Sequence, residues 1–386
     1  MVPEEWKKDI LGNLFEFKNG LNAEKEQYGS GYKFVNVMDV FGNDILIESK
    51  IIGRVQVSDK QLGDYQLKYG DVLFNRTSET FEEIAMAAVY LDKAVATFGG
   101  FVIRGRPKSN EISPDFSAFL FQASGFRTQA IKLGQGAVRA NIGQKDLAKV
   151  SILVPPIREQ KKIAQVLSTW DKAIATTEKL LANSQQQKKA LMQQLLTGKK
   201  RFSEFKGDLK HVELGSLLEY KQPTPYLVKS TDYNNDYETP VLTAGKTFIL
   251  GYTNELEGIY KDKLPVIIFD DFTTASKFVD FPFKAKSSAM KILTARDSVS
   301  IKYVFEAMQM FDFTIGGHQR HWISIFSNLV IAIPEIVEQQ KIASVLSTAD
   351  FEIETLKQQL NHLKQEKKAL MQQLLTGKRR VKVDAA

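Results

Sequence analysis

The sequence contains no cysteine, only four histidines, and no apolar run long enough to cross a membrane. The absence of cysteine excludes disulfide bonds, thiolate metal sites and cysteine nucleophiles. A membrane-spanning helix needs about 20 consecutive apolar residues, and neither such a stretch nor a charged-then-apolar leader is found. The sequence therefore predicts a soluble, cytoplasmic protein with no membrane partner.

Motifs for catalysis are also lacking. The Asn/Asp–Pro–Pro–aromatic motif of amino-methyltransferases is absent, because the one Pro–Pro step, Pro155–Pro156, follows a valine. There is no serine-centred nucleophile elbow and no glycine-rich loop in a strand–loop–helix setting. His318 and His321 have no third partner at a metal-binding spacing. We expect a chain that binds without catalysing, with no cofactor, no metal and no small-molecule substrate of its own.

The composition bounds the architecture. A length of 386 residues suggests two to four domains, and 43% hydrophobic with 10% aromatic residues is typical of globular cores. The net charge is +7, but residues 156–201 alone carry +7 and residues 334–386 carry +2, which leaves −2 for the rest. Any binding of nucleic acid by the globular parts must therefore depend on local patches.

Two long stretches occur twice. The string KKALMQQLLTGK fills residues 188–199 and again residues 367–378, and EQKKIAQVLST at 159–169 returns as EQQKIASVLST at 338–348. Both repeats are offset by 179 residues, so no insertion separates them. A constant offset of this kind indicates two long elements of equal length and shape.

The spacing of apolar residues predicts that these elements are helices of a coiled coil. Seam positions alternate four and three residues apart, which places one apolar stripe along each helix. The seam consists of Ile163, Leu167, Trp170, Ile174, Leu181, Leu191 and Leu195 in the first copy and Ile342, Leu346, Ile353, Leu356, Leu360, Leu363, Leu370 and Leu374 in the second. Gly198 and Gly377 stand where a left-handed residue would end each helix.

Each helix would be about 40 residues and roughly 60 Å long. Two ordinary amphipathic core helices are the less favoured alternative, since such helices average about 11–12 residues.

The repeats divide the chain into four segments. Residues 1–155 form a first unit, 156–199 the first long helix, 200–333 a linker with a second unit, and 334–386 the second long helix with a basic tail. Short β-rich runs between glycine and Asn/Asp turns, mixed with helical stretches, predict an α/β (α+β) fold for both units.

Polar residues suited to reading nucleic acid follow strand ends in both units. They are Asn75, Arg76, Thr77, Ser78, Arg139, Asn141 and Gln144 in the first unit, and Asp270, Asp271, Thr273, Thr274, Lys277, Gln319 and Arg320 in the second. Arginine pairs with guanine, Asn and Gln pair with adenine, and carboxylates accept from cytosine. These clusters predict DNA-binding loops, and ordinary solvated loops are the alternative.

The arrangement resembles the specificity subunits of Type I DNA restriction–modification systems. The resemblance is carried by PPIREQKKIAQVLS, IPEIVEQQKIASVLS, the duplicated KKALMQQLLTGK and the string GDVLFNRT. It implies that each variable unit is a target recognition domain for one half of a split double-stranded DNA site, and that the helices are the spacer. It also implies two modification (adenine methyltransferase) subunits, which would bind S-adenosylmethionine, and restriction subunits as partners.

The expected fold is two recognition domains separated by an antiparallel coiled coil with an internal pseudo-twofold repeat. The second unit connects the two helices, and a compact domain of about 120 residues has a radius of gyration of only about 14 Å. The second helix must therefore begin near the end of the first, which favours an antiparallel pair. Full overlap then places Trp170 against Lys367 and Ala349 against Lys188. A cation–π contact between Lys367 and Trp170 should therefore make Lys367→Ala cost more stability than Lys188→Ala, because Ala349 offers Lys188 no aromatic face.

Two other functions stay open from the residues alone. A long coiled coil could serve as a protein-interaction scaffold with no DNA role. The acidic and basic residues from Asp270 to Lys286 could instead form the site of a metal-dependent nuclease.

Overall fold

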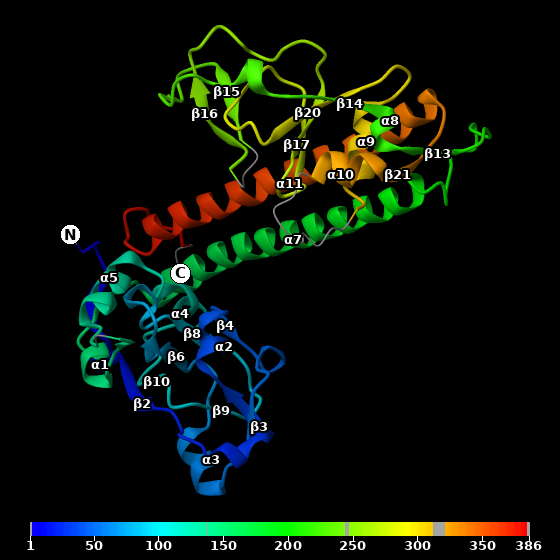
Figure 1. Ribbon diagram of the computed structural model, residues 1–386. Helices are drawn as coiled ribbons and strands as arrows, with labels where there is room; N and C mark the ends of the chain where they lie inside the picture. The colour runs from blue at the N-terminus through cyan, green and yellow to red at the C-terminus, as the bar shows by residue number, and fades with distance from the viewer. Residues whose placement is uncertain (1, 137, 244–246, 312–320, 384–386) are drawn as a thin grey trace. The chain divides into compact units, whose positions relative to one another are not determined.

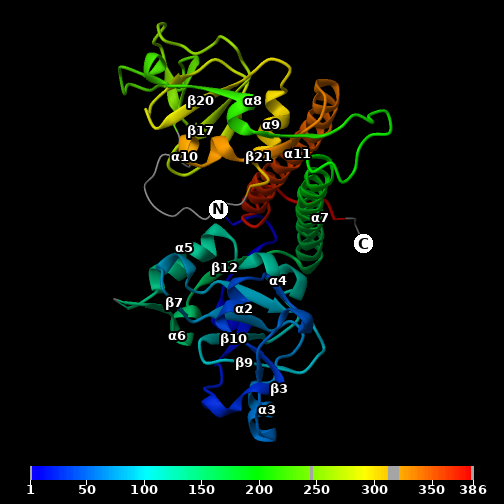
Figure 2. The same cartoon turned by 45° about the vertical axis from the view of Figure 1, so that its right-hand side comes forward.

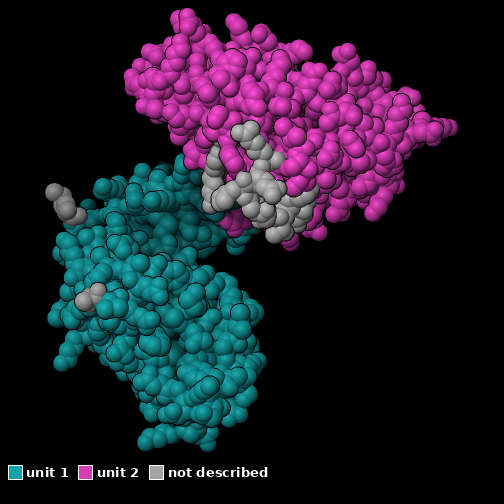
Figure 3. Space-filling model, viewed as in Figure 1, with its two compact units in different colours: residues 1–177, 359–386 teal, residues 178–358 magenta. Residues whose placement is uncertain are grey.

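The computed structural model describes residues 2–136, 138–243, 247–311 and 321–383. Contacts divide the chain into two compact units (Figure 3): the first unit comprises residues 1–177 and 359–386, and the second unit residues 178–358. Each unit thus joins one globular part to a portion of both long helices. The four segments expected from the sequence are regrouped into two.

The first unit holds most of the short elements (Figure 1). Its strands are β1 (Lys7–Ile10), β2 (Phe15–Asn19), β3 (Tyr28–Val35), β4 (Ile45–Leu46), β5 (Arg54–Val55), β6 (Val72–Asn75), β7 (Thr77–Ser78), β8 (Ala87–Tyr90), β9 (Ala96–Phe98), β10 (Val102–Pro107), β11 (Ala140–Asn141) and β12 (Ser151–Val154). Its short helices are α1 (Leu11–Leu14), α2 (Val37–Phe41), α3 (Asp59–Tyr65), α4 (Pro114–Leu120), α5 (Ser124–Leu133) and α6 (Gln144–Leu147).

The main sheet of the first unit is buried on both faces. Its strand order is β2–β10–β6–β8–β4, and all four residues of β6 are buried. Val72 and Phe74 point into the cluster formed with α4, α5 and the long helices, whereas Leu73 packs with residues of α2, β4 and β9. Because both faces are covered, the strand is apolar throughout and does not alternate with polar residues.

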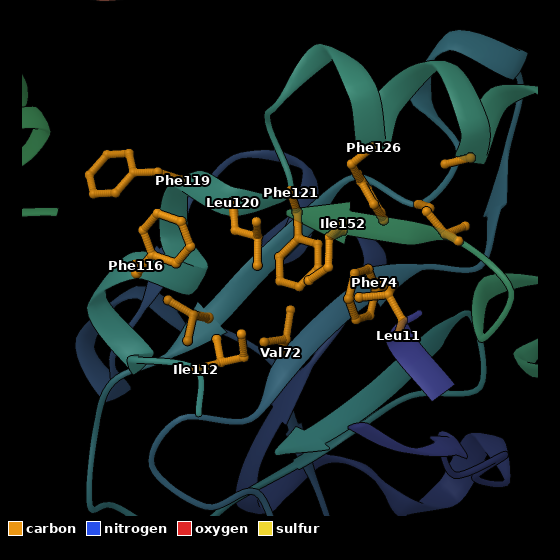
Figure 4. Packing of buried hydrophobic residues seen from close by; sticks show 14 of the residues in the cluster. Leu11, Val72, Phe74, Ile112, Phe116, Phe119, Leu120, Phe121, Phe126 and Ile152 are labelled. Carbon is orange, nitrogen blue, oxygen red and sulfur yellow. The ribbon is translucent and has the colours of Figure 1, made fainter. Parts of the chain in front are cut away.

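Aromatic rings fill the space between this sheet and α4 and α5 (Figure 4). The Phe74 ring meets the Phe121 ring edge to face at 4.8 Å, and Phe121 meets Phe126 at 5.1 Å. Rings in this geometry gain about 0.5–1.5 kcal/mol per pair beyond the burial of their area. This packing fixes the two helices on the sheet.

The second unit repeats this plan with a different sequence. Its strands are β13 (Lys210–Glu213), β14 (Leu218–Lys221), β15 (Thr239–Leu242), β16 (Ile249–Thr253), β17 (Val266–Asp270), β18 (Ser276–Val279), β19 (Lys284–Ala285), β20 (Met290–Ala295) and β21 (Val330–Ile333), and its short helices are α8 (Leu214–Leu217), α9 (Ile301–Met308) and α10 (His321–Ser324). The main sheet has the order β14–β20–β17–β18. Ile267 and Phe269 face α9 and the long helices, and Val266 and Ile268 face the opposite cluster.

Both units begin and end alike. Strand β1 pairs antiparallel with β12, and β13 pairs antiparallel with β21, just before each long helix starts. A glycine lies in each of α1 and α8, and a Cβ on Gly12 or Gly215 would come within 3.1 Å of the Cβ of Ala148 or Ser327. A Cβ at this distance would make an unusually tight contact and require its neighbour to shift, which glycine avoids where Leu–Gly opens each unit.

The two repeats form the long helices α7 (Ile157–Leu195) and α11 (Ile336–Leu374), each of 39 residues. Gly198 and Gly377 follow their ends with φ of +72° and +68°, so the predicted left-handed helix ends are confirmed. A polar group of α7 pairs with one of α11 in each unit. Lys367 bonds to Asp171 in the first unit and Lys188 bonds to Asp350 in the second, one residue from the alignment expected for antiparallel helices.

None of the fifteen predicted seam residues is exposed. Six residues toward the helix ends are buried within the units, as is Ile353 in the middle of α11, and the remaining ones are half-buried. The six are Ile163, Leu167, Leu195, Ile342, Leu346 and Leu374. Seam residues near the helix ends are less exposed to water because both the partner helix and a globular part cover them.

The contact expected between Trp170 and Lys367 is wrong in its detail. Trp170 lines the same hollow as Glu366, Ala369 and Leu370, but the ammonium of Lys367 stands 5.5 Å over the ring of Phe119 on α4. The same ammonium also pairs with Asp171 of α7. The sequence could not reveal this, because Phe119 is distant in the chain.

Across residues 2–383, apart from the gaps given above, no helix combines the length and the apolar character needed to span a membrane.

Candidate nucleic-acid interface

Two of the polar clusters predicted from the first unit are brought together by a short pair of strands. Strand β7, labelled in Figure 2, pairs with β11, and in the register of this pair Thr77 lies opposite Asn141. The Thr77 hydroxyl donates to the Asn141 side-chain oxygen at 2.7 Å, and the Asn141 amide donates to the Arg139 carbonyl at 3.0 Å. Arg139 and Asn141 are exposed. These side chains are therefore held in place and open to a ligand.

Asn75 and Ser78 have a different role from the one predicted. Asn75 is 1% exposed, its side-chain oxygen accepts from the Thr77 amide, and its side-chain amide points at the Glu83 carbonyl. The Ser78 hydroxyl donates to the Glu83 carboxylate at 2.6 Å. Both side chains shape the loop after β6 and have little surface left to read a base.

Arg76 and Gln144 are also engaged with the backbone. The half-buried Arg76 donates to the Gly100 carbonyl at 3.3 Å. The Gln144 amide, oriented to satisfy its neighbours, donates to the Phe17 carbonyl and accepts from the Asn19 amide. Of the first unit's predicted residues, Arg139 and Asn141 thus offer exposed side chains, whereas Arg76, Thr77 and Gln144 are half-buried.

The two aspartates of the second unit are structural. Asp270 is 5% exposed, and it accepts from the Phe272 amide at 3.0 Å and from the Thr273 hydroxyl at 2.6 Å. Asp271 is likewise buried and accepts from the Trp322 amide at 2.8 Å. Their prediction as base readers is corrected, because carboxylates saturated inside the fold cannot also accept from cytosine.

The other predicted residues of the second unit fall into two groups. Thr273 and Lys277 are exposed, and Thr274 is half-buried with a φ of +59° at the tip of the β17–β18 turn. Gln319 and Arg320 lie outside the described residues.

The suggested nuclease cluster is dispersed in the described parts of the chain. Lys284 is buried and pairs with Glu255 at 2.9 Å, while the Asp271 carboxylate lies 3.6 Å from the Lys291 ammonium. Among the described residues, no three His, Asp or Glu side chains gather as metal ligands would. Nothing in this geometry favours the nuclease hypothesis.

Several residues around the first interface were missed from the sequence. Met38 and Phe41 of α2, together with Phe101, line a pocket beside Thr77 and Arg139. No local pattern marks them, because they come from parts of the chain 24 or more residues from the GDVLFNRT string. The loop bearing Glu83 is braced by Arg127, which donates to the Glu82 carbonyl at 2.7 Å and whose pKa is lowered by burial.

Each unit closes its helix end with the same ionic clamp. In the first unit both oxygens of Glu159 accept from Arg380, at 2.7 and 2.8 Å, and one also accepts from the Trp6 indole at 2.9 Å. In the second unit Arg201 holds Glu338 in the same bidentate way. These pairs sit at repeat-equivalent positions, offset by 179 residues.

A glutamine in each unit joins the long helix to the start of a short one. Gln160 is fully buried and accepts from the Ser113 amide at 2.8 Å, next to α4. Its equivalent, Gln339, accepts from the Ser300 amide at 2.9 Å, next to α9. The EQ dipeptide of both repeats therefore fixes a globular part on the helices.

A buried ion network is found at the repeat lysine of the second unit. Lys188 pairs with Asp350 at 2.5 Å and with Glu306 of α9 at 2.9 Å, and Lys302 pairs with the same two carboxylates at 2.9 and 2.6 Å. Glu306 is 0% exposed. Burial opposes ionisation of Asp350, but hydrogen bonds from Lys188 and Lys302 outweigh it and lower its pKa.

The sequence model of the family described as "Type I restriction modification DNA specificity domain" matches residues 3–183 and 206–365. This is well over half of the chain, and the chain therefore belongs to that family. Specificity subunits are non-catalytic components of Type I systems, in keeping with the expectation of a chain that binds without catalysing.

Two curated relatives show the extent of the similarity. The specificity subunit of the EcoR124I/EcoR124II Type I restriction enzymes of Escherichia coli is 55% identical over 132 residues, and this stretch is 33% of either protein. The putative MjaX specificity subunit of Methanocaldococcus jannaschii is 26% identical over 99% of this chain and 95% of its own length.

The fold is shared with a solved structure. The S subunit of a Type I restriction–modification system from M. genitalium is 15% identical and matches with a TM-score of 0.64 over 96% of each chain. At this identity the match bears on the fold alone.

Proposed function

We propose that the chain reads a bipartite sequence of double-stranded DNA for a Type I restriction–modification enzyme. Each globular part reads one half of the site, and α7 and α11 set the gap between the halves. The observation that carries the proposal is a duplicated scaffold that presents two different surfaces. The clamps Glu159–Arg380 and Glu338–Arg201 are the same contact built twice, whereas the loops beyond β6 and β17 share little sequence.

The exposed side chains at these loops suit contacts to DNA. Arg139 and Asn141 provide the two groups most often used to recognise guanine and adenine. Lys277 and Thr273 occupy the corresponding turn of the second unit, where they would contact phosphate or base edges.

The gap between half-sites follows from helix length. Each helix of 39 residues is about 58 Å long at about 1.5 Å per residue. At about 3.4 Å per base pair this corresponds to at most about 17 base pairs.

The reactions belong to partners in this proposal. Two adenine methyltransferase subunits would bind S-adenosylmethionine and act on the site that this chain selects, and restriction subunits would join for cleavage. The chain itself would hold no cofactor and would work in the cytoplasm.

Selection of bound sequences from randomised duplexes tests the proposal. The full chain, alone and with its methyltransferase partner, should enrich two short conserved blocks separated by a fixed number of variable positions. Replacing residues 1–155 by the first unit of another family member should change one block and leave the other intact. Enrichment of one continuous block, or a change in both blocks, would contradict the assignment of one reader to each unit.

A further inference from the structure

The first unit contains a pocket that neither the repeats nor the family accounts for. It has a volume of about 450 Å³ and lies between α2, the β6–β7 turn and the loop that carries Glu83. It opens beside Thr77 and Arg139, which are among the side chains proposed to contact DNA. Its size is in the range of pockets that enclose small organic molecules, about 300–1,000 Å³.

The floor of the pocket is polar and already ordered. Asn75 and Ser78 are buried there, and both are tied to residues of the neighbouring loop, Asn75 to the Glu83 carbonyl and Ser78 to the Glu83 carboxylate. On one side Thr77 is tied to Asn141. A pocket built on such bonds exists before its ligand arrives and loses little freedom on binding.

The walls are apolar side chains that the fold leaves uncovered. Met38 is 72%, Phe101 60% and Phe41 38% exposed, and all three line the pocket with Val37. An exposed apolar group beside a polar rim is typical of a recognition site. Two aromatic rings and a thioether form surfaces on which a flat, apolar group can stack.

The rim carries charges of both signs. Within the described ranges, neither the Arg139 guanidinium nor the Glu79 carboxylate has a side-chain partner. The ligand should therefore have flat apolar faces together with hydrogen-bond donors and acceptors around its edge. Nucleobases have this combination.

We propose that this pocket receives one base unstacked from the bound DNA. The inference rests on the proposed function, because it takes DNA to lie against Thr77 and Arg139. A duplex offers apolar surface to a protein as thymine methyl groups or as the faces of unstacked bases. A single methyl group would fill only a small part of the pocket volume of about 450 Å³ and leave most of the apolar walls exposed to water.

An unstacked base matches the pocket in size as well as in chemistry. It would lie against Phe41 or Phe101, with its edge toward Arg139, Glu79 and the polar floor. Unstacking and unpairing a base are unfavourable, but stacking on an aromatic side chain and new hydrogen bonds offset the loss. The pocket would be specific, because only a base that forms hydrogen bonds with the rim residues offsets the free energy lost when it leaves the stack.

The test begins once the selection experiment has given a defined site, so failure of the proposed function would be seen first and separately. The fluorescent base 2-aminopurine is placed at each position of the half-site read by the first unit, one duplex at a time. On binding of the full chain without its methyltransferase partner, which would itself extrude an adenine, emission should rise strongly at one position. A mismatch opposite that position should tighten binding about tenfold, because the pair no longer has to be broken.

The variants Phe41→Ala and Phe101→Ala should reduce the emission rise severalfold at that position. Tyr69→Ala removes a comparably exposed aromatic of the same unit that does not line the pocket, so it should leave the rise unchanged. Specific binding without an emission change at any position would overturn the proposal. The proposal would also be overturned if replacing thymine by uracil lowered the affinity while no position showed an emission change. That result would mean that the apolar walls contact thymine methyl groups.

Discussion

The repeat lysines Lys188 and Lys367 occupy equivalent places, yet we expect replacement of Lys188 by alanine to be the more damaging of the two. The structure thus reverses the order of importance expected from the sequence. Lys188 is 2.9 Å from Glu306, a carboxylate with no exposed surface, and also pairs with Asp350. The ion pair of Lys367 is with Asp171, whose side chain is 42% exposed, and the charge of Lys367 also favours ionisation of the exposed Asp44 carboxyl. Alanine at 188 therefore removes a cation from a buried carboxylate, whereas alanine at 367 leaves a carboxylate that water can solvate.

The magnitudes follow from this difference. Breaking a buried ion pair by removing one partner costs about 3–5 kcal/mol. Lys302 remains 2.6 Å from Glu306, so we expect about 2–3 kcal/mol for Lys188→Ala. The loss for Lys367→Ala is about 1 kcal/mol, from a half-exposed ion pair and the cation–π contact with Phe119.

Amide hydrogen exchange read by mass spectrometry measures both effects locally. Because about 1.4 kcal/mol is a factor of ten, exchange of peptides covering α9 should accelerate about 30- to 150-fold in Lys188→Ala. Peptides covering α4 should accelerate about fivefold in Lys367→Ala. Lys188→Met retains an unbranched apolar stem and should behave like the alanine variant, and Lys189→Ala, at an exposed neighbour, is the control. Equal acceleration in the two units, or a wild-type rate for Lys188→Met, would refute the reasoning.

Three further predictions concern the clamps, acid stability and the spacer. Arg201→Ala should destabilise its unit more than Arg380→Ala does, because Glu159 keeps the Trp6 indole as a donor; equal shifts in urea midpoint would contradict this. The pKa of Asp350 is lowered in the folded chain, so its contribution to stability is fully present above the ordinary pKa of an aspartate and is lost as the pH falls through the folded value. Amide exchange in α9 should therefore accelerate below about pH 4. Acceleration confined to α4 would count against this role of Asp350. Inserting one heptad in the middle of both long helices should lengthen the preferred gap by about three base pairs in the selection assay, whereas an unchanged gap would mean that partners set it.

The sequence by itself determined the helical scaffold of this protein. The positions and ends of α7 and α11, and the seam residues from Ile163 to Leu374, follow from a repeat of about 3.5 residues and from Gly198 and Gly377. This information is local, since a helix depends on residues three and four apart and its end on one residue that tolerates positive φ. Strand order was not available, because β2 pairs with β10 and β14 with β20, strands distant in the chain.

Tertiary structure alone decided what the polar residues do. Asn75 and Asp270 were predicted to contact bases, but packing buries them and their side-chain oxygens accept hydrogen bonds within loops. Arg139 and Lys277 remain exposed to solvent. It also placed Glu306 beside Lys188, at a distance of 118 residues in the chain, and Phe119 under Lys367. The burial of a side chain depends on every element that covers it, so it cannot be predicted from a short stretch of sequence. For the same reason the pocket walls at Met38, Phe41 and Phe101 were visible only in the folded chain.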